Sequence, residues 1–153
     1  MPMIEGLVLP RVDDAESGPF WAGCARHELL VQRCAGCGRR RVPPRPMCPA
    51  CQSLAAEWEA VSGRGTIWSF VVPHPPLLPA YQQFAPYNVV VVALDEDPTL
   101  RFVGNLVAAE GEPINSVDPA TIRIGEPVQV VFDQVAEDVT FPRWVRTDGA
   151  PAS

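Results

Sequence analysis

The sequence predicts a mainly β protein: an N-terminal helical segment, a four-cysteine zinc ribbon and then a five-stranded barrel of the OB type. Two C-x-x-C pairs are separated by ten residues, an arrangement that folds into a small ribbon around one metal ion. After them, about 85 residues alternate short β-branched or aromatic runs with Gly and Pro, which favours a small closed barrel over a sandwich. The expected parts are a helical segment at 1–33, a zinc ribbon at 34–62, an OB-fold at 63–146 and a disordered tail at 147–153.

The two cysteine pairs, Cys34/Cys37 and Cys48/Cys51, predict a structural zinc site. Each pair presents two sulfurs at a tight turn, and four thiolates around a tetrahedral centre suit Zn²⁺. Gly38 can take the positive φ that such a turn needs. Iron in a rubredoxin-like site would use the same ligands, and structural disulfides are the alternative without metal. A four-sulfur site leaves no open position for water, so the metal is expected to hold structure rather than perform chemistry.

Residues 14–33 are predicted to form one helix before the ribbon, because apolar residues recur there at helical spacing. Phe20 and Cys24 lie on the apolar stripe of this helix. Cys24 has no C-x-x-C partner and is expected to be a buried core thiol. His27 is expected to be a satisfied interface residue rather than a catalytic base.

A long loop at residues 73–86 separates the first two expected barrel strands. It carries Leu77, Tyr81 and Phe84, which is much apolar surface for a connection without expected secondary structure. In an OB barrel this loop borders the ligand face; alternatively, it folds over the barrel end and completes the core. A short helix is expected to begin at Asp118. The ribbon's last strand is expected at 58–61, and the barrel strands at 65–72, 89–94, 100–107, 122–124 with 128–132, and 139–145.

Charge is unevenly distributed along the chain. Residues 1–63 hold seven Arg and seven acidic residues, whereas 64–153 hold five Arg and eleven acidic residues and so carry the whole net charge of −6. No acidic residue lies between Glu28 and Glu57. The arginines of this window either offset the double negative charge of a four-thiolate zinc site or form a docking patch for phosphate or carboxylate. They are Arg33, Arg39, Arg40, Arg41 and Arg45.

Composition argues against several classes of protein. The first ten residues have no basic start and contain proline and an acid, so no signal peptide is expected and the cysteines are expected to stay reduced in the cytoplasm. The longest apolar run, Val89–Leu94, is far too short to span a membrane.

Single-stranded nucleic acid is an alternative ligand, but the barrel half is net negative and therefore unsuited to a phosphate backbone. An independent enzyme is a further alternative, although neither histidine sits in a recognisable catalytic constellation.

An ordered set of short motifs over residues 18–144 resembles a known family. Before and within the ribbon these are F-W-x-G-x-x-x-x-E-L, Q-R-C-x-x-C-G and P-P-R-x-x-C-P-x-C. In the barrel they are S-G-x-G-x-(I/V)-x-S-F, P-Y-x-V-x-x-V-x-L-D-E, I-G-x-P-V-x-V-x-F and a terminal F-P-x-(F/W). The set is similar to the acyl-CoA-associated family that pairs a rubredoxin-like zinc ribbon with an OB-fold, formerly described as nucleic-acid-binding proteins containing a Zn-ribbon.

The resemblance implies a non-catalytic accessory subunit. Members of that family assemble with thiolase-fold enzymes or hotdog-fold hydratases that act on CoA thioesters, and some are needed for retro-aldol cleavage of steroid side-chain CoA esters. By this resemblance the chain is expected to bind acyl-CoA and to join such a partner in lipid or steroid side-chain metabolism. Residues 18–33 and 73–86 are the expected contact surfaces, because they combine apolar side chains with expected exposure.

The arginine window and the apolar loop together suggest how a CoA thioester would lie. The 3′-phosphate and pyrophosphate suit guanidinium groups, while the uncharged arm and acyl chain suit the loop. If the partner instead supplies the phosphate site, the arginines only balance the zinc thiolates. The predicted CoA-binding residues are Arg39, Arg40, Arg41, Arg45, Leu77, Tyr81 and Phe84.

Overall fold

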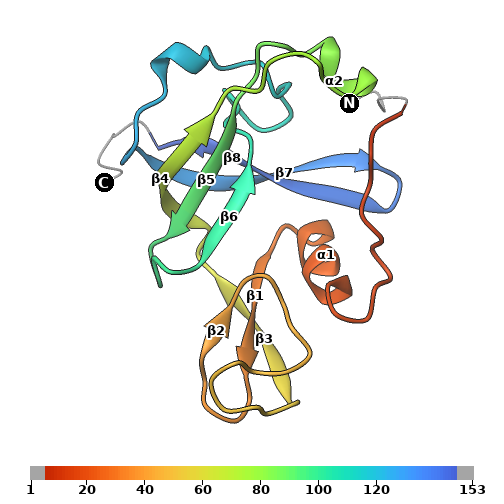
Figure 1. The fold of residues 1–153 in the computed structure, drawn as a ribbon, viewed down its shortest axis with the longest axis vertical. Helices are drawn as coiled ribbons and strands as arrows, with labels where there is room; N and C mark the ends of the chain where they lie inside the picture. Colours follow the sequence, from red (N-terminus) through yellow and green to blue (C-terminus); the bar gives the residue numbers. More distant parts are fainter. Residues whose placement is uncertain (1–5, 148–153) are drawn as a thin grey trace.

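The computed structural model describes residues 6–147 as a small ribbon sheet beside a curled five-stranded sheet (Figure 1). The ribbon sheet has the strand order β2-β1-β3, and the larger sheet has the order β6-β5-β4-β7-β8; every strand pair is antiparallel. Apart from its first residue, the predicted tail at 147–153 lies outside the described residues. The ribbon strands are β1 (Leu29–Cys34), β2 (Arg40–Arg41) and β3 (Ala56–Val61); the barrel strands are β4 (Arg64–Val71), β5 (Val89–Leu94), β6 (Arg101–Gly104), β7 (Pro127–Ala136) and β8 (Val139–Arg146).

The N-terminal helix is shorter than the sequence predicted. Helix α1 (Gly18–Ala25) ends where His27 reverses the chain with a φ of 62°. The prediction of helix was wrong for residues 14–17, which form turns before α1, and for residues 26–33, because β1 begins at Leu29 and pairs with β2 on one edge and β3 on the other. Pairing on both edges, with five of the six strand residues buried, outweighs the helical spacing of the apolar side chains. The segment 1–33 therefore contains the first ribbon strand.

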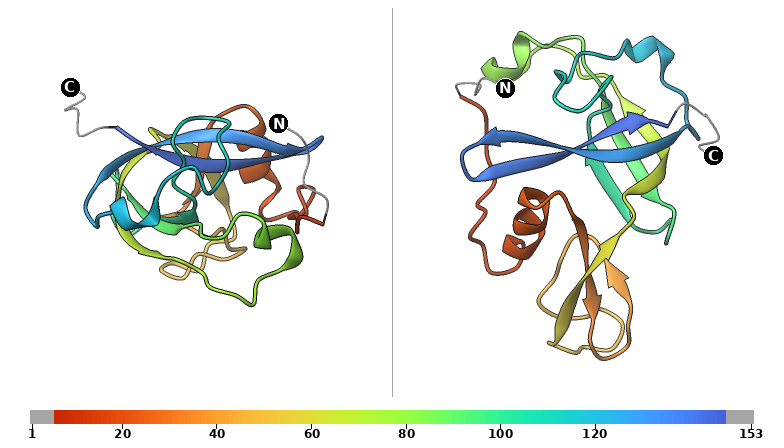
Figure 2. Two further views of the ribbon diagram at one scale, coloured as in Figure 1. Left: turned by 90° about the horizontal axis from the view of Figure 1, so that it is seen from above. Right: turned by 180° about the vertical axis from the view of Figure 1, so that it is seen from behind.

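Helix α1 sits between the ribbon and the end of the β7–β8 hairpin (Figures 1 and 2). Gly23 lets it approach β1, since an added Cβ would lie 2.7 Å from the Leu30 side chain. Cys24 is fully buried, and burial raises the pKa of its thiol to about 12, which confirms a core thiol. The His27 ring stacks on Phe132 with its centroid 5.2 Å away, although His27 itself is exposed.

The larger sheet curls into a half-barrel with one open side. Its edge strands are β6 and β8, and beyond the end of β6 the chain reaches β8 through a parallel bridge between Leu106 and Trp144. There the Val107 N–H donates to the Trp144 carbonyl at 2.8 Å, and the Trp144 N–H donates to the Asn105 carbonyl at 3.0 Å. The expected closed barrel is therefore open along β6, because that strand is only four residues long and ends before the bridge.

A buried amide holds the segment that follows β6. The Asn88 side chain is fully buried; its Nδ2 donates to the Leu106 carbonyl at 2.9 Å, and its Oδ1 accepts from the Leu106 N–H at 2.7 Å. Asn105 Nδ2 in turn donates to the Asn88 carbonyl at 2.6 Å. These bonds replace the strand ladder that is missing at this edge and fix Asn105 beside the open side of the half-barrel.

Most of the predicted strands are confirmed, including the one that ends the ribbon. A 3₁₀ helix, η1 (Pro119–Thr121), confirms the short helix expected at Asp118, whose side chain accepts from the Ala120 N–H at 3.0 Å. Residues 122–124 form no strand. The loop at 73–86 contains a short helix, α2 (Pro79–Gln82), which the sequence reading missed although proline is favoured at a first helical position.

Between residues 6 and 147, the chain forms no helix with the length and apolar character needed to cross a membrane.

Candidate metal centre and ligand groove

The four predicted cysteines converge on one point of the ribbon. Their sulfur atoms all lie within 4.8 Å of one another, with Cys34 Sγ 3.5 Å from Cys51 Sγ and Cys37 Sγ 3.7 Å from Cys48 Sγ. For a Zn–S bond of about 2.3 Å, tetrahedral geometry places neighbouring sulfurs about 3.8 Å apart. A disulfide needs about 2.05 Å, and all four cysteines are free, so the disulfide alternative is contradicted. The donor set fits a tetrahedral thiolate-bound metal.

Two matching turns carry these ligands. The Gly38 N–H donates to the Cys34 carbonyl at 2.9 Å, and the Gln52 N–H donates to the Cys48 carbonyl at the same distance. The residue after each pair has positive φ, 79° at Gly38 as predicted and 62° at Gln52. Sequence reading missed Gln52, although its position four residues after Cys48 repeats that of Gly38 after Cys34.

Backbone N–H groups favour the thiolate form of the first ligand of each pair. The N–H groups of Cys37 and Gly36 point at Cys34 Sγ from 3.4 and 3.3 Å. The hydrogen bond from Cys37 is the main cause that lowers the pKa of Cys34 to about 6. The Cys51 N–H similarly lowers the pKa of Cys48. Thiolates are the form that binds metal, so both turns are prepared for ligation.

Arg41 is separated from the other arginines of the window, because neighbouring residues of β2 point to opposite faces of the ribbon sheet. Arg33, Arg39 and Arg40 line one small cleft beside Cys37 and Asp97. Arg40 is paired with Arg33, and its guanidinium binds both carboxylate oxygens of Glu59 at 2.9 and 2.8 Å. This hydrogen bonding lowers the pKa of Glu59. Arg39 and Arg45 are exposed. Arg41 instead is buried, with only 7% of its surface exposed.

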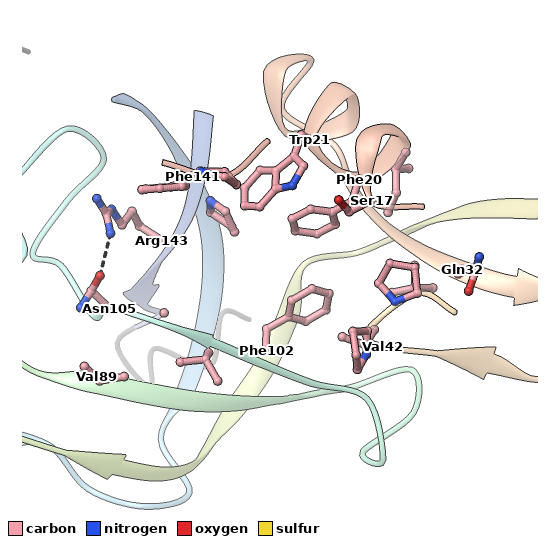
Figure 3. A pocket seen from close by; sticks show the side chains of 18 of the residues that line it. Ser17, Phe20, Trp21, Gln32, Val42, Val89, Phe102, Asn105, Phe141 and Arg143 are labelled. Carbon is pink, nitrogen blue, oxygen red and sulfur yellow. Dashed lines mark hydrogen bonds between the residues drawn. The ribbon is translucent and has the colours of Figure 1, made fainter. Parts of the chain in front are cut away.

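A large groove lies where the ribbon, α1, the loop before β5 and the open side of the half-barrel meet (Figure 3). Its volume is about 750 Å³, within the range of small-molecule sites. Of the seven predicted CoA-binding residues, Arg41 and Tyr81 line this groove. The other five lie outside it: Arg39, Arg40, Arg45, Leu77 and Phe84.

Aromatic side chains form the wall of the groove between α1 and the half-barrel (Figure 3). Phe20 stacks on Phe102 with centroids 5.8 Å apart and meets Trp21 edge-on at 4.9 Å. Trp21 continues to Phe141 of β8 at 5.8 Å. The F-W pair of the first motif and the terminal F-P motif thus meet across the groove, a contact that no local sequence signal reveals.

At the barrel end of the groove, a second arginine is neutralised by its neighbours. Arg143 Nη1 donates to Asn105 Oδ1 at 2.6 Å, a bond visible in Figure 3, and its Nε lies 3.4 Å from Asp133 Oδ2. Burial lowers the pKa of Arg143, while the Asp133 carboxylate opposes that effect. Sequence reading singled out none of these three residues.

At the ribbon end, Arg41 has no such compensation. It lies in register with Gln32 of β1, which is itself in register with Trp58 of β3, and all three side chains line the groove. Arg41 Nη2 donates to the Arg45 carbonyl at 3.0 Å. Among residues 6–147, Nε and Nη1 of Arg41 have no hydrogen-bond partner although both atoms are buried.

Two family models match consecutive parts of the chain. Residues 21–57 match "ChsH2, rubredoxin-like zinc ribbon domain", and residues 58–133 match "ChsH2, C-terminal OB-fold domain". Together with the four convergent cysteines, the first match confirms the predicted zinc ribbon and its structural zinc. The second confirms the OB-fold.

Similar proteins include two hydratase subunits and a scaffold protein. The chain is 35% identical over 136 residues to a probable enoyl-CoA hydratase alpha subunit of Thermomonospora curvata, covering 87% of this chain and 38% of that protein. It is 36% identical over 125 residues to the 3-oxo-4,17-pregnadiene-20-carboxyl-CoA hydratase alpha subunit of Mycobacterium tuberculosis, covering 82% and 34%. It therefore spans little more than a third of these relatives. A DUF35 domain-containing scaffold protein of Methanothermobacter thermautotrophicus is 33% identical, with 74% of this chain and 77% of that protein covered.

Solved structures agree with these matches. A chain of the Ltp2-ChsH2(DUF35) aldolase superposes with a TM-score of 0.76 at 30% identity, covering 90% of this chain and 98% of that one. A DUF35 protein from Sulfolobus solfataricus, at 12% identity and a TM-score of 0.54 over 84% of this chain and 83% of that one, shows the fold alone. The chain therefore belongs to the ChsH2/DUF35 family of proteins that pair a rubredoxin-like zinc ribbon with an OB-fold.

Proposed function

We propose that this chain is a non-catalytic accessory subunit that assembles with a thiolase-fold or hotdog-fold enzyme and helps it bind an acyl-CoA. The observation that carries this proposal is the match to a chain of an aldolase over 98% of that chain's length at 30% identity. Because this match is nearly end to end, a thiolase-like aldolase is the favoured partner. A hotdog-fold hydratase is the second candidate, supported by hydratase subunits that the chain matches over about a third of their length.

An exposed apolar sheet face supports a docking role. Trp68 and Val71 of β4 and Val103 of β6 are 50%, 59% and 68% exposed. The Arg101 guanidinium lies over the Trp68 ring at 3.8 Å, and Val103, the register partner of Val91, also lines the groove. Strand β6 is also a free edge of the sheet. Apolar side chains gathered beside an unpaired strand edge are typical of a surface that a partner covers. We propose this face, together with loop 73–86, as the contact surface.

Co-expression with a thiolase-fold or hotdog-fold enzyme from the same genome should give a complex that elutes as one species in size-exclusion chromatography. Val103→Asp should weaken that complex by about tenfold or more, since it places a charge in an apolar interface. Ile124→Asp is a matched control, because Ile124 is 67% exposed but lies in the turn before β7. Unchanged affinity for Val103→Asp, or equal loss in both variants, would remove this face from the interface.

The CoA phosphates are proposed to meet the exposed arginines of the ribbon. Arg39 and Arg45 are accessible, whereas Arg40 is engaged by Glu59 and Arg41 faces the groove. A charge-assisted hydrogen bond is worth roughly 1.5–3 kcal/mol, so Arg39→Ala or Arg45→Ala should weaken CoA binding to the complex about tenfold or more. Calorimetry on complexes of unchanged zinc content measures this, with the exposed Arg64→Ala as control. Unaltered affinity in both variants would assign the phosphates to the partner.

A further inference from the structure

We infer that the groove is a binding site for a small neutral molecule with a flat, mainly apolar body and a carbonyl oxygen, which accepts a hydrogen bond from the Tyr87 hydroxyl or the Gln32 amide. Every residue that lines the groove belongs to this chain, so the site needs no partner residue. The inference concerns the isolated chain and goes beyond the accessory role, so either can fail while the other stands.

The charged groups of the groove favour a neutral ligand. Arg143 is bound by Asp133, and Arg11, at the rim, lies 3.1 Å from Asp13. The unpartnered Nε and Nη1 of Arg41 are fully enclosed by the protein and are not open to the groove. None of the described lining residues is acidic. An ion that entered the groove would lose its hydration without meeting a free opposite charge, which is unfavourable.

Two buried neutral side chains of the groove have unused hydrogen-bond donors. Gln32 is only 7% exposed, and its Oε1 accepts from the Arg45 N–H at 2.7 Å, which leaves Nε2 without a partner among residues 6–147. Tyr87 is only 8% exposed, and its hydroxyl group makes no hydrogen bond within the same residues. Unlike the two Arg41 nitrogens, neither of these atoms is fully enclosed. Because both side chains line the groove, the two donors are left for a molecule that enters it.

The chemistry of these donors identifies the group that the ligand must bring. Burial raises the pKa of Tyr87, so its hydroxyl stays protonated and neutral at physiological pH. The Gln32 Nε2 group can only donate. A buried donor that stays unpaired is unfavourable, and an acceptor that reaches it recovers that free energy. A carbonyl oxygen is such an acceptor, because it has two lone pairs, no proton and no net charge.

The aromatic wall determines the body of the ligand (Figure 3). The rings of Phe20, Trp21, Phe102 and Phe141 follow one another across the groove, and flat ring systems pack well against such rings. A space of about 750 Å³ with apolar walls and a few polar groups is typical of a small-molecule site.

Two other occupants fit less well. The phosphates of CoA would lie against the aromatic rings without a free cation to bind them. An apolar side chain of a partner protein would leave the Tyr87 hydroxyl and Gln32 Nε2 unpaired. A neutral carbonyl compound satisfies the wall and the donors together.

The test uses the full zinc-loaded chain and three naphthalenes of nearly equal shape. They are 2-acetylnaphthalene, a neutral ketone; 2-naphthoate, which is charged; and 2-ethylnaphthalene, which has no oxygen. Equilibrium dialysis measures the affinity and the number of molecules bound. The ketone should bind one per chain, about tenfold or more tighter than 2-naphthoate and about three- to tenfold tighter than 2-ethylnaphthalene, the gain expected of one neutral hydrogen bond. No saturable binding of the ketone, or binding of either other probe as tight as that of the ketone, would overturn the inference.

Variants then locate the carbonyl oxygen. Tyr87→Phe and Gln32→Met each remove one donor, and one of them should bring the affinities for the ketone and for 2-ethylnaphthalene to within about twofold of each other. Gln134→Met is the matched control, because Gln134 is exposed and lies outside the groove. A ketone preference that survives in both groove variants, or that is lost in Gln134→Met, would contradict the assignment. If a groove variant does not fold, the comparison of the three probes on the unaltered chain still decides.

Discussion

Cys48→Ser is expected to unfold the ribbon and to leave little soluble protein. Cys48 is fully buried and is one of the four sulfurs that surround the metal position. Structural zinc binds small ribbon-like peptides with roughly 10–16 kcal/mol at neutral pH, and that binding energy is folding energy. A domain has only about 5–15 kcal/mol of stability, so the ribbon cannot lose one ligand and remain folded. Strand β1 and the groove should be lost with it.

Metal analysis and circular dichroism measure this effect. The purified, reduced chain should hold one zinc ion, and a strong chelator should lower its melting temperature sharply. Cys24→Ala is the matched control, because Cys24 is buried in the core away from the metal-binding sulfurs and its loss should leave the zinc content unchanged. A Cys48→Ser protein that stays soluble with a native melting temperature, or a wild type without zinc or iron, would contradict the structural role of the metal.

Gly65→Ala is expected to destabilise the half-barrel by about 3 kcal/mol or more. Gly65 lies in β4 between Leu94 of β5 and Val128 of β7, so the strand is fixed on both edges. An added Cβ would overlap the carbonyl oxygen of Ala93 and lie 2.7 Å from Val92 Cγ1. A backbone oxygen in a paired strand cannot move aside as a flexible side chain can. The stability loss is therefore expected at or above the upper end of the values typical of overpacked cores.

Urea denaturation measures the change in the free energy of unfolding. Gly125→Ala is the control, because Gly125 has a φ of 96° but an added Cβ would meet nothing within 4 Å. It should lose only about 1 kcal/mol, the cost of left-handed backbone in a residue with a side chain. If both variants lose the same free energy of unfolding, the close approach of β5 is not the reason why glycine stands at position 65, the second glycine of the S-G-x-G motif.

Local signals made the metal site and most strands predictable. The spacing of the cysteines indicates both metal-binding turns. The run of apolar residues alone identifies both ends of β5, Val89–Leu94. The prediction failed at residues 26–33, where apolar spacing suits a helix but pairing with β2 and β3 selects a strand. The zinc ribbon therefore begins before its first cysteine in the sequence, at the start of β1.

The groove was not predictable, because it is assembled from segments far apart in the chain. Arg40 and Arg41 look equivalent in the sequence. Because side chains alternate along a strand, Arg40 instead binds Glu59 and Arg41 lies at the groove. Asn88 and Asn105 carry no local signal, because their hydrogen bonds depend on where the half-barrel fails to close. Tyr81 was identified as part of an apolar loop, but only the structure shows which of the loop residues reach the groove.

The most direct measurement is the turnover of an acyl-CoA by the thiolase-fold or hotdog-fold enzyme that co-purifies with this chain, with and without the zinc-loaded chain. The chain alone should show no turnover, and its addition should raise the partner's kcat/KM by about tenfold or more, equivalent to about 1.4 kcal/mol of transition-state stabilisation. Val103→Asp should abolish the increase while Ile124→Asp preserves it. Turnover by the isolated chain, or a partner whose activity is the same with and without it, would contradict the role of accessory subunit.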